Sequence, residues 1–179
     1  MLLDLLRARR SVRRYADQPV DTETLDRLLE AALLSPSSKN TKAWRFVVVR
    51  DRDTIQKLSA AKPAGASFVR HANAVIAVCG DTTVSDVWVE DCAIAALLLH
   101  LAAADQGLAS CWVQLRLRSH DDQTSSQDYV AGLLGLPETV RPLALVAVGH
   151  PAETKPPHDP ADLPFASVSR ERFGEPWRQ

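Results

Sequence analysis

The segment 85–106 limits what this chain can fold into more than any other feature. Between residues 93 and 104 nearly every position is apolar, whichever side of a helix it would occupy. A helix that is apolar almost all round must be covered on most of its surface. The sequence therefore predicts a central buried helix over 85–106, closed by Gly107. Its most apolar stretch, 92–104, is only about 13 residues long and contains His100, so no span of a bilayer is expected.

The rest of the chain alternates between helix and strand patterns. Ser35-Pro36 ends the helix that Asp21 caps, because the residue before a proline is disfavoured in a helix. Further helices are predicted over 2–10, 51–61 and 129–134, and strands rich in β-branched residues over 44–50, 74–80, 108–117 and 143–149. This order predicts a single α+β domain over 1–179, built around four strands.

Composition excludes several classes of function. With 21 Lys plus Arg against 22 Asp plus Glu, the net charge of -1 argues against a general binder of nucleic acid or anionic membranes. Cys79, Cys92 and Cys111 form no CxxC pair, so buried reduced thiols are expected rather than disulfides or a structural zinc site. Neither a P-loop nor GxGxxG is present. No secretory signal follows Met1, so a soluble, cytoplasmic protein is expected.

The first segment that could carry chemistry is Arg-rich and lies near the start of the chain. Arg9, Ser11 and Arg13 alternate, so an extended backbone would direct all three side chains toward one point. Two guanidinium groups and a hydroxyl are suitable donors for a phosphate. A solvated basic face, or contacts to nucleic acid, would explain the same pattern.

Three other segments carry weaker signals. The polar loop 35–44 precedes a strand and could present N–H groups and hydroxyls to a ligand, although turn formation alone explains its composition. Gln114 and Arg116 fall on one face of a strand, as they would in any half-exposed strand. Lys155 could be a second phosphate ligand or a surface lysine.

Taken together, these segments resemble the nitroreductase family of FMN-dependent oxidoreductases. The matching motifs, in order, are R-R-S-V-R-x-Y, S-P-S-S-K-N-x-x-x-W-x-F, E-D-x-A-I-A leading into G-L-x-S-C-W, and G-H-P-A-E. They extend over nearly the whole chain. The variants W-V-Q-L-R-x-R-x-H-D-D and K-P-P-H-D are similar to a compact bacterial subgroup.

The resemblance implies a three-layer fold and a homodimer. It implies a mixed, mostly antiparallel sheet flanked by helices, with a C-terminal arm exchanged onto the partner subunit and flavin sites at the subunit interface. The tail 150–179 agrees with this expectation, because apolar side chains in an irregular arm need a surface to pack on. These side chains are Phe165, Val168, Phe173 and Trp177.

The resemblance also implies the residues of a non-covalent FMN site. One group matches the segment that holds the flavin phosphate: Arg9, Arg10, Ser11 and Arg13. Of these, Arg13 is also expected near the N1/O2 edge of the ring. A second group matches the loop that approaches the flavin from the other subunit: Pro36, Ser37, Ser38 and Asn40.

Two further pairs complete the implied site. Gln114 and Leu115 occupy the place where family members run backbone past flavin N5 and O4. Lys155 and His158 match a C-terminal basic pair on the phosphate. The sequence departs from the family pattern at Lys42-Ala43, where Gln-Pro is usual, and at His158-Asp159, where many members have arginines.

The implied activity is hydride transfer from NADH or NADPH to flavin N5, followed by reduction of a nitroaromatic, quinone or similar acceptor in a ping-pong cycle. Such chemistry belongs mainly to the cofactor, so no acid–base pair is required of the protein. Alternatives are enone reduction, dehalogenation or desaturation on the same fold, or a non-catalytic flavin-binding protein. His100 is expected to be a core residue. His120-Asp121-Asp122 is assigned to the surface, and no metal site is expected.

Overall fold

The computed structural model describes residues 1–177 and contains one four-stranded sheet with the strand order β1-β2-β4-β3. All neighbouring strands pair antiparallel. The strands are β1 (Trp44–Val49), β2 (Ala74–Asp81), β3 (Ala109–Gln114) and β4 (Val140–Gly149). The four predicted strands are therefore confirmed, although β3 ends three residues earlier than expected.

A bulge explains the early end of β3. Pro142 in β4 has no N–H to donate, and the register between β2 and β4 shifts between Val78 and Cys79, opposite this proline. The shift leaves Leu143 unpaired with β2, and its carbonyl accepts the N–H groups of both Leu115 and Arg116, each at 3.1 Å. Both donors turn toward one acceptor, so the regular ladder stops at Gln114.

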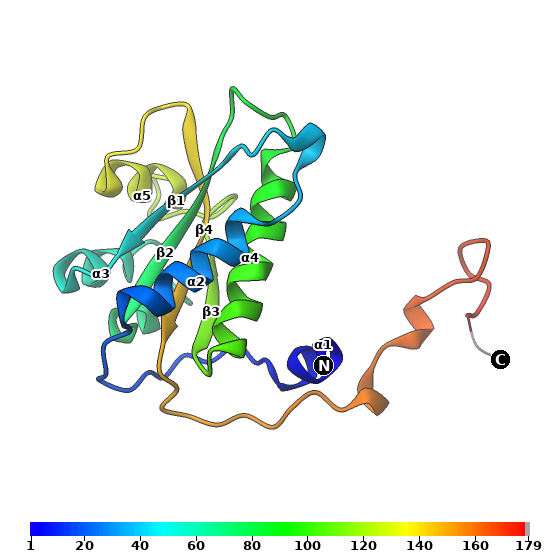
Figure 1. Cartoon of the computed structure of the whole chain (residues 1–179). Helices are drawn as coiled ribbons and strands as arrows, with labels where there is room; N and C mark the ends of the chain where they lie inside the picture. The colour runs from blue at the N-terminus through cyan, green and yellow to red at the C-terminus, as the bar shows by residue number, and fades with distance from the viewer. Residues whose placement is uncertain (178–179) are drawn as a thin grey trace.

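Helices cover both faces of the sheet, as expected for a three-layer fold (Figure 1). Helices α2 (Thr22–Leu33) and α4 (Trp88–Asp105) pack on one face, and α3 (Arg52–Leu58) and α5 (Ser126–Leu134) on the other. Short 3₁₀ turns are η1 (Ser38–Asn40), η2 (Ser67–His71), η3 (Pro160–Asp162) and η4 (Phe165–Ser167).

Strand β2 shows how the sequence builds the two apolar layers. It is buried on both sides, and its alternate residues belong to different cores. The core beneath α2 and α4 receives Ala74, Ile76 and Val78, and the core beneath α3 and α5 receives Val75, Ala77 and Cys79. All three cysteines of the chain are buried and free, as the sequence predicted.

Helix α4 is buried on one side only, which corrects the expectation of an all-round buried helix. Its sheet-facing residues, such as Ala95 and Leu99, are fully buried. Ile94 and Leu97 on the other side remain 39% and 49% exposed. The reason is that α2 and the sheet cover one half of the helix, while α1 (Leu2–Ala8) reaches only its C-terminal end (Figure 1). None of the helices within residues 1–177 is long and apolar enough to cross a bilayer.

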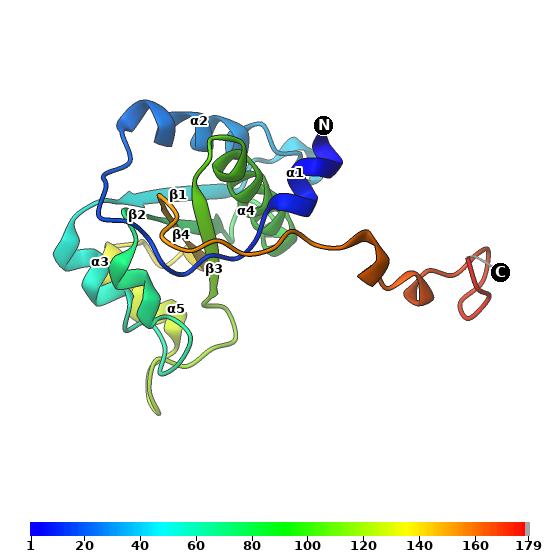
Figure 2. The same cartoon turned by 90° about the horizontal axis from the view of Figure 1, so that it is seen from below.

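The two ends of the domain run past each other beside β3 and β4 (Figure 2). Ser11 forms a parallel bridge with Ser110, and Tyr15 an antiparallel bridge with Pro151. The first bridge is what makes the pairing mixed, as expected, because the named strands are antiparallel throughout. The Asn73 side chain joins the two segments, donating to Ala16 O at 3.0 Å and accepting from the His150 N–H at 3.1 Å.

From about residue 157 the chain leaves the body of the domain as an arm (Figures 1 and 2). Its tip folds on itself through a bridge between Ser169 and Pro176 and a hydrogen bond from Trp177 N to Val168 O. Phe173 is fully exposed and Trp177 is half exposed. Exchange of this arm onto a partner subunit stays a prediction.

Candidate functional site

The site is built on the open edge of the sheet. Strand β3 is the last strand, pairing with β4 on one side only. On its other side, Ser110 O accepts the N–H of Val12 at 3.2 Å. Because the outward direction of the backbone alternates along an edge strand, the N–H groups of Trp112 and Gln114 face the same open side. This edge therefore offers hydrogen-bond donors to a ligand lying along it.

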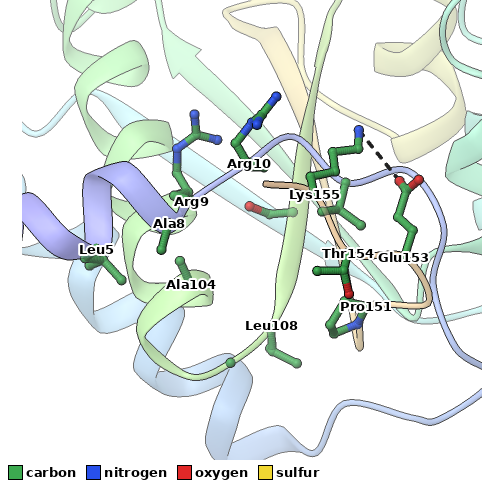
Figure 3. A pocket seen from close by; sticks show the side chains of 13 residues that line it. Leu5, Ala8, Arg9, Arg10, Ala104, Leu108, Pro151, Glu153, Thr154 and Lys155 are labelled. Atoms are coloured by element: carbon green, nitrogen blue, oxygen red, sulfur yellow. Dashed lines mark ion pairs between the residues drawn. The ribbon is translucent and has the colours of Figure 1, made fainter. Parts of the chain in front are cut away.

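Basic side chains gather at the beginning of this edge. Arg9, Arg10 and Lys155 line one groove, together with Ser110 of β3 and Ala104 of α4 (Figure 3). The groove forms because the N-terminal and C-terminal segments are tied together there. Lys155 Nζ donates to Ser11 O at 2.6 Å, and the Arg10 guanidinium donates to the Pro156 carbonyl. The structure thus brings Arg9, Arg10, Ser11 and Lys155 close together, and their binding of a phosphate stays a prediction.

The charge of this groove is positive and largely uncompensated. Within residues 1–177, the guanidinium groups of Arg9, Arg10 and Arg13 make no ion pair. Lys155 has a carboxylate neighbour, Glu153, at 3.7 Å (Figure 3). Unpaired arginines fixed by backbone contacts are suited to bind a phosphate.

Glu153 also lines this groove. It is the last residue of the motif G-H-P-A-E, which assigned it no role. Its Oε1 accepts the backbone N–H of Arg13 at 2.8 Å. This hydrogen bond, helped by the nearby Lys155 charge, lowers the pKa of Glu153. The carboxylate therefore holds the Arg13 backbone while leaving its guanidinium free, which lies 5.7 Å from the Phe68 ring centroid.

Gln114 and Leu115 lie at the far end of the same edge. Gln114 follows Ser110 by four positions, or about 13 Å along a strand. The Gln114 amide is held at both ends, because its Oε1 accepts the Trp112 indole N–H and its Nε2 donates to Arg116 O, both at 2.9 Å. Leu115 is fully buried. The edge is therefore rigid where the predicted contact to a ring system lies.

His158 is the predicted site residue that the structure does not bring into this groove. Its backbone N–H donates to Arg7 O at 2.8 Å, and its exposed side chain lines a neighbouring groove with Arg10 and Leu163. The arm begins to leave the domain here, so Lys155 alone supplies the C-terminal cation of the first groove.

The loop 36–40 lies far from the basic groove within one chain. The Ser38 N–H donates to Asp91 Oδ1 at 2.9 Å, near the start of α4, whereas Ala104, near the end of α4, lines the basic groove. Ala104 follows Asp91 by thirteen positions of helix, which is about 20 Å. One chain cannot bring its own Pro36, Ser37, Ser38 and Asn40 to its own Arg9 groove.

The same loop has a strained backbone. Lys39, Asn40 and Lys42 have φ values of 50°, 56° and 52°, in the left-handed region that non-glycine residues rarely occupy. In addition, the hydroxyl groups of Ser35 and Thr41 are buried without a hydrogen-bond partner. Strain and unsatisfied polar groups of this kind concentrate at ligand-binding sites.

Asp91, in the first turn of α4, is the residue that holds this loop. Replacing Asp91 by alanine leaves the Ser38 N–H without its acceptor and removes the neighbour of Ser85 Oγ at 3.4 Å. We expect a loss of about 1–3 kcal/mol in the free energy of unfolding, measured by urea denaturation. Asp91→Asn keeps an acceptor oxygen and should recover most of that loss. Equal destabilisation by both variants would contradict this role.

His100 takes the core position that the sequence predicted, whereas His120, expected at the surface, is half-buried with 23% of its side chain exposed. His100 is buried in the core, its Nδ1 lies 2.7 Å from Ser110 Oγ, and burial together with the Arg9 charge lowers its pKa to about 4. His120 stacks on Tyr129 with ring centroids 3.9 Å apart. Within the described part of the chain, no group of His, Cys, Asp or Glu side chains could hold a metal ion.

This chain is similar to known proteins of one family. A sequence profile described as "Nitroreductase family" matches residues 6–78 and 60–150 of this chain. A protein of Archaeoglobus fulgidus that carries the provisional name NADH dehydrogenase/NAD(P)H nitroreductase is 35% identical over 157 residues, which covers 86% of this chain and 87% of the relative.

Solved structures agree in fold. An FMN-dependent nitroreductase of Clostridium difficile R20291 superposes with a TM-score of 0.94 at 36% identity, covering 96% of this chain and 99% of that one. A nitroreductase-like protein of Desulfovibrio desulfuricans, solved in complex with FMN, has a TM-score of 0.76 at 28% identity, with coverage of 96% and 97%.

Proposed function

The chain belongs to the nitroreductase family, and from that premise we propose that it is an FMN-dependent oxidoreductase that uses NADH or NADPH to reduce a nitroaromatic, a quinone or a similar electrophilic acceptor in a ping-pong cycle. One observation carries this proposal. The open edge of β3 has Arg9 and Arg10, which make no ion pair within the described residues, at one end and the outward N–H of Gln114 at the other.

The residues present fit FMN. Its phosphate would lie with Arg9, Arg10, Ser11 and Lys155, where three cations face the single carboxylate of Glu153 around one groove. Its ring system would lie toward Gln114 and Leu115, where the Trp112 indole holds the Gln114 side chain. When bound, FMN supplies the redox centre that takes electrons from the nicotinamide donor and passes them to the acceptor.

Arg13 has the clearest electrostatic role in this proposal. Its guanidinium is free of ion pairs within the described residues, because Glu153 engages the backbone N–H instead. It would hold a positive charge at the N1/O2 edge of the ring, where reduction adds negative charge. A positive charge that is already in position stabilises the reduced ring without reorganisation of the protein. No side chain is required to act as an acid or base.

We also propose that two copies of the chain complete each site. Ile94 and Leu97 leave an apolar stripe along α4 without cover from residues 1–177. The loop 36–40 lies about 20 Å along α4 from its own basic groove, so it would serve the groove of the partner. The arm carries Phe173 and Trp177, exposed, away from its own domain. A homodimer would cover the stripe and give the arm a surface to pack on.

Leu97→Asp tests this arrangement. A carboxylate at the centre of the apolar stripe would have to be desolvated in a dimer, so we expect the dimer to weaken by at least about 100-fold. Sedimentation velocity at micromolar concentration should then show a monomer with reduced FMN content. Leu97→Met keeps the volume and apolar character and should remain dimeric. A Leu97→Asp protein that stays dimeric would place the interface elsewhere.

Steady-state turnover tests the activity. FMN-loaded protein should oxidise NADH or NADPH when a nitroaromatic or a quinone is supplied, and double-reciprocal plots at several acceptor concentrations should be parallel, as a ping-pong cycle requires. Retention of FMN without oxidation of either donor would instead identify a non-catalytic flavin-binding protein.

A further inference from the structure

Another cavity, of about 240 Å³, adjoins the basic groove between α4 and the edge strand β3. Three elements line it: α4 with Ala93, Leu97 and His100, β3 with Trp112, and the N-terminal segment with Arg9 and Ser11. The positions on α4 are spaced by four and three residues, so they share one face of the helix. Arg9 lines the basic groove as well, and the two cavities therefore meet at this side chain.

This cavity lies on the route between the two ends of the proposed FMN site. Helix α4 runs beside β3 (Figure 1) and in the opposite direction, because only residues 106–108 join them. The basic groove touches Ala104 and Ser110, whereas the cavity touches Leu97, further back on α4, and Trp112, further along β3. The Trp112 indole in turn donates to Gln114 Oε1 at 2.9 Å. The cavity therefore borders the middle of the open edge.

His100 brings a polar atom to this cavity from the core. Its side chain belongs to a residue that is only 8% exposed, and its Nδ1 lies 2.7 Å from Ser110 Oγ. Burial, and then the charge of Arg9, lower the pKa of His100 to about 4, so the ring is neutral at neutral pH. Within residues 1–177, its Nε2 makes no hydrogen bond and is not fully enclosed by protein. This nitrogen is therefore open to the cavity.

A hydroxyl group is the ligand that suits this nitrogen. In a neutral imidazole one nitrogen donates and the other accepts, so the role of His100 Nε2 is the opposite of the role that Nδ1 takes toward Ser110. A hydroxyl can donate or accept and fits both cases, whereas a phosphate or carboxylate only accepts. The apolar surfaces of Leu97 and Trp112 suit the carbon chain that carries such a hydroxyl.

We propose that His100 Nε2 hydrogen-bonds a hydroxyl of the ribityl chain of FMN, the polyol chain that joins the phosphate to the ring system. This rests on the proposed function and adds to it a cofactor contact from a residue that the sequence assigned to the core. Trp112, whose ring centroid lies 6.4 Å from that of His100, flanks the same stretch of chain. The contact holds the chain against the edge while the phosphate and the ring occupy its two ends.

FMN analogues test this contact by binding alone. Each secondary hydroxyl of the ribityl chain is removed in turn, and quenching of flavin fluorescence on titration with protein gives the dissociation constants. In native protein, the analogue without the hydroxyl that contacts His100 should bind about three- to tenfold more weakly than FMN. In the double variant His100→Phe with Ser110→Ala, FMN and this analogue should bind equally. The second substitution is included because phenylalanine alone would leave the buried Ser110 hydroxyl without its partner.

Two further variants separate the His100 contact from its surroundings. Ser110→Ala alone leaves His100 Nε2 in place and should keep the difference between FMN and the analogue. His100→Gln supplies an amide that can also bind a hydroxyl, so it should keep the difference as well. Urea denaturation of all variants identifies any that fail to fold, and the comparison of FMN with its analogue within each folded variant cancels general changes in affinity.

The results that would overturn the proposal are distinct. If every analogue shows the same difference from FMN in the native protein and in the double variant, another group binds the chain. If the double variant instead loses only the preference for FMN over riboflavin, His100 serves the phosphate. If it becomes monomeric in sedimentation velocity with unchanged analogue differences, His100 serves the interface between copies. Discrimination that depends on His100 without oxidation of NADH or NADPH would overturn the proposed function and leave the His100 contact in place.

Discussion

Replacement of Arg9 and Lys155 together by glutamine should give a folded protein that no longer retains FMN. Both side chains line the groove proposed for the phosphate, and Arg9 makes no ion pair within the described residues. A hydrogen bond to a charged group contributes about 1.5–3 kcal/mol, so losing two weakens FMN binding by about 10²- to 10⁴-fold. Quenching of FMN fluorescence on titration with protein measures this directly.

Arg7→Gln combined with Arg27→Gln is the matched control. It also removes two positive charges, but Arg7 and Arg27 pair with Asp4 and Glu23 on exposed helix surfaces. Such pairs contribute little to stability, so FMN affinity should stay within about twofold of the native value. If the Arg9 and Lys155 variant binds FMN as tightly as this control, the phosphate is held elsewhere.

Replacement of Gly149 by alanine should cost about 2–3 kcal/mol in the free energy of unfolding. A Cβ at Gly149 would lie 2.1 Å from Asn73 Oδ1 and 2.9 Å from Tyr15 Cδ1. Asn73 must then move, although its amide joins the N-terminal segment at Ala16 O to the C-terminal segment at His150 N. Because these segments form the basic groove, FMN affinity should fall as well. Urea denaturation measures the stability.

Gly132→Ala is the control for this prediction. Gly132 lies within α5, and beyond its chain neighbours and the backbone of its own helix no atom lies within 4 Å of the position of an added Cβ. Alanine is the better helix former, so this variant should equal or exceed the native stability by up to about 1 kcal/mol. Equal stabilities for the two variants would mean that the Asn73 contact does not hold the segments together.

Much of the fold could be predicted from residue patterns. Valine-rich runs mark the strands, Asp21 caps α2 as expected by accepting the Thr24 N–H at 2.8 Å, and the basic segment Arg9–Arg13 does lie beside Lys155, 142 residues later than Arg13. Local propensity and alternation are sufficient for such features, because each depends on neighbours along the chain.

Other features depend on contacts that no local pattern specifies. The end of β3 is set by the Leu143 carbonyl, which a bulge opposite Pro142 releases. Asp91 holds a loop more than fifty positions earlier through the Ser38 N–H. Helix α4 stays half exposed because α2 and the sheet cover only one of its sides. The loop after β3 meets the loop after α3 through His120, whose Nδ1 lies 2.7 Å from Ala60 O.

The central claim is that this chain holds an FMN that nicotinamide donors reduce, and the visible absorption spectrum tests it most directly. Purified protein, reconstituted with FMN if necessary and kept free of oxygen, should show the oxidised flavin bands. Addition of NADH or NADPH should bleach them within the time of turnover. A flavin spectrum that neither donor changes would contradict the oxidoreductase assignment, and a protein that FMN cannot reconstitute would contradict the cofactor site itself.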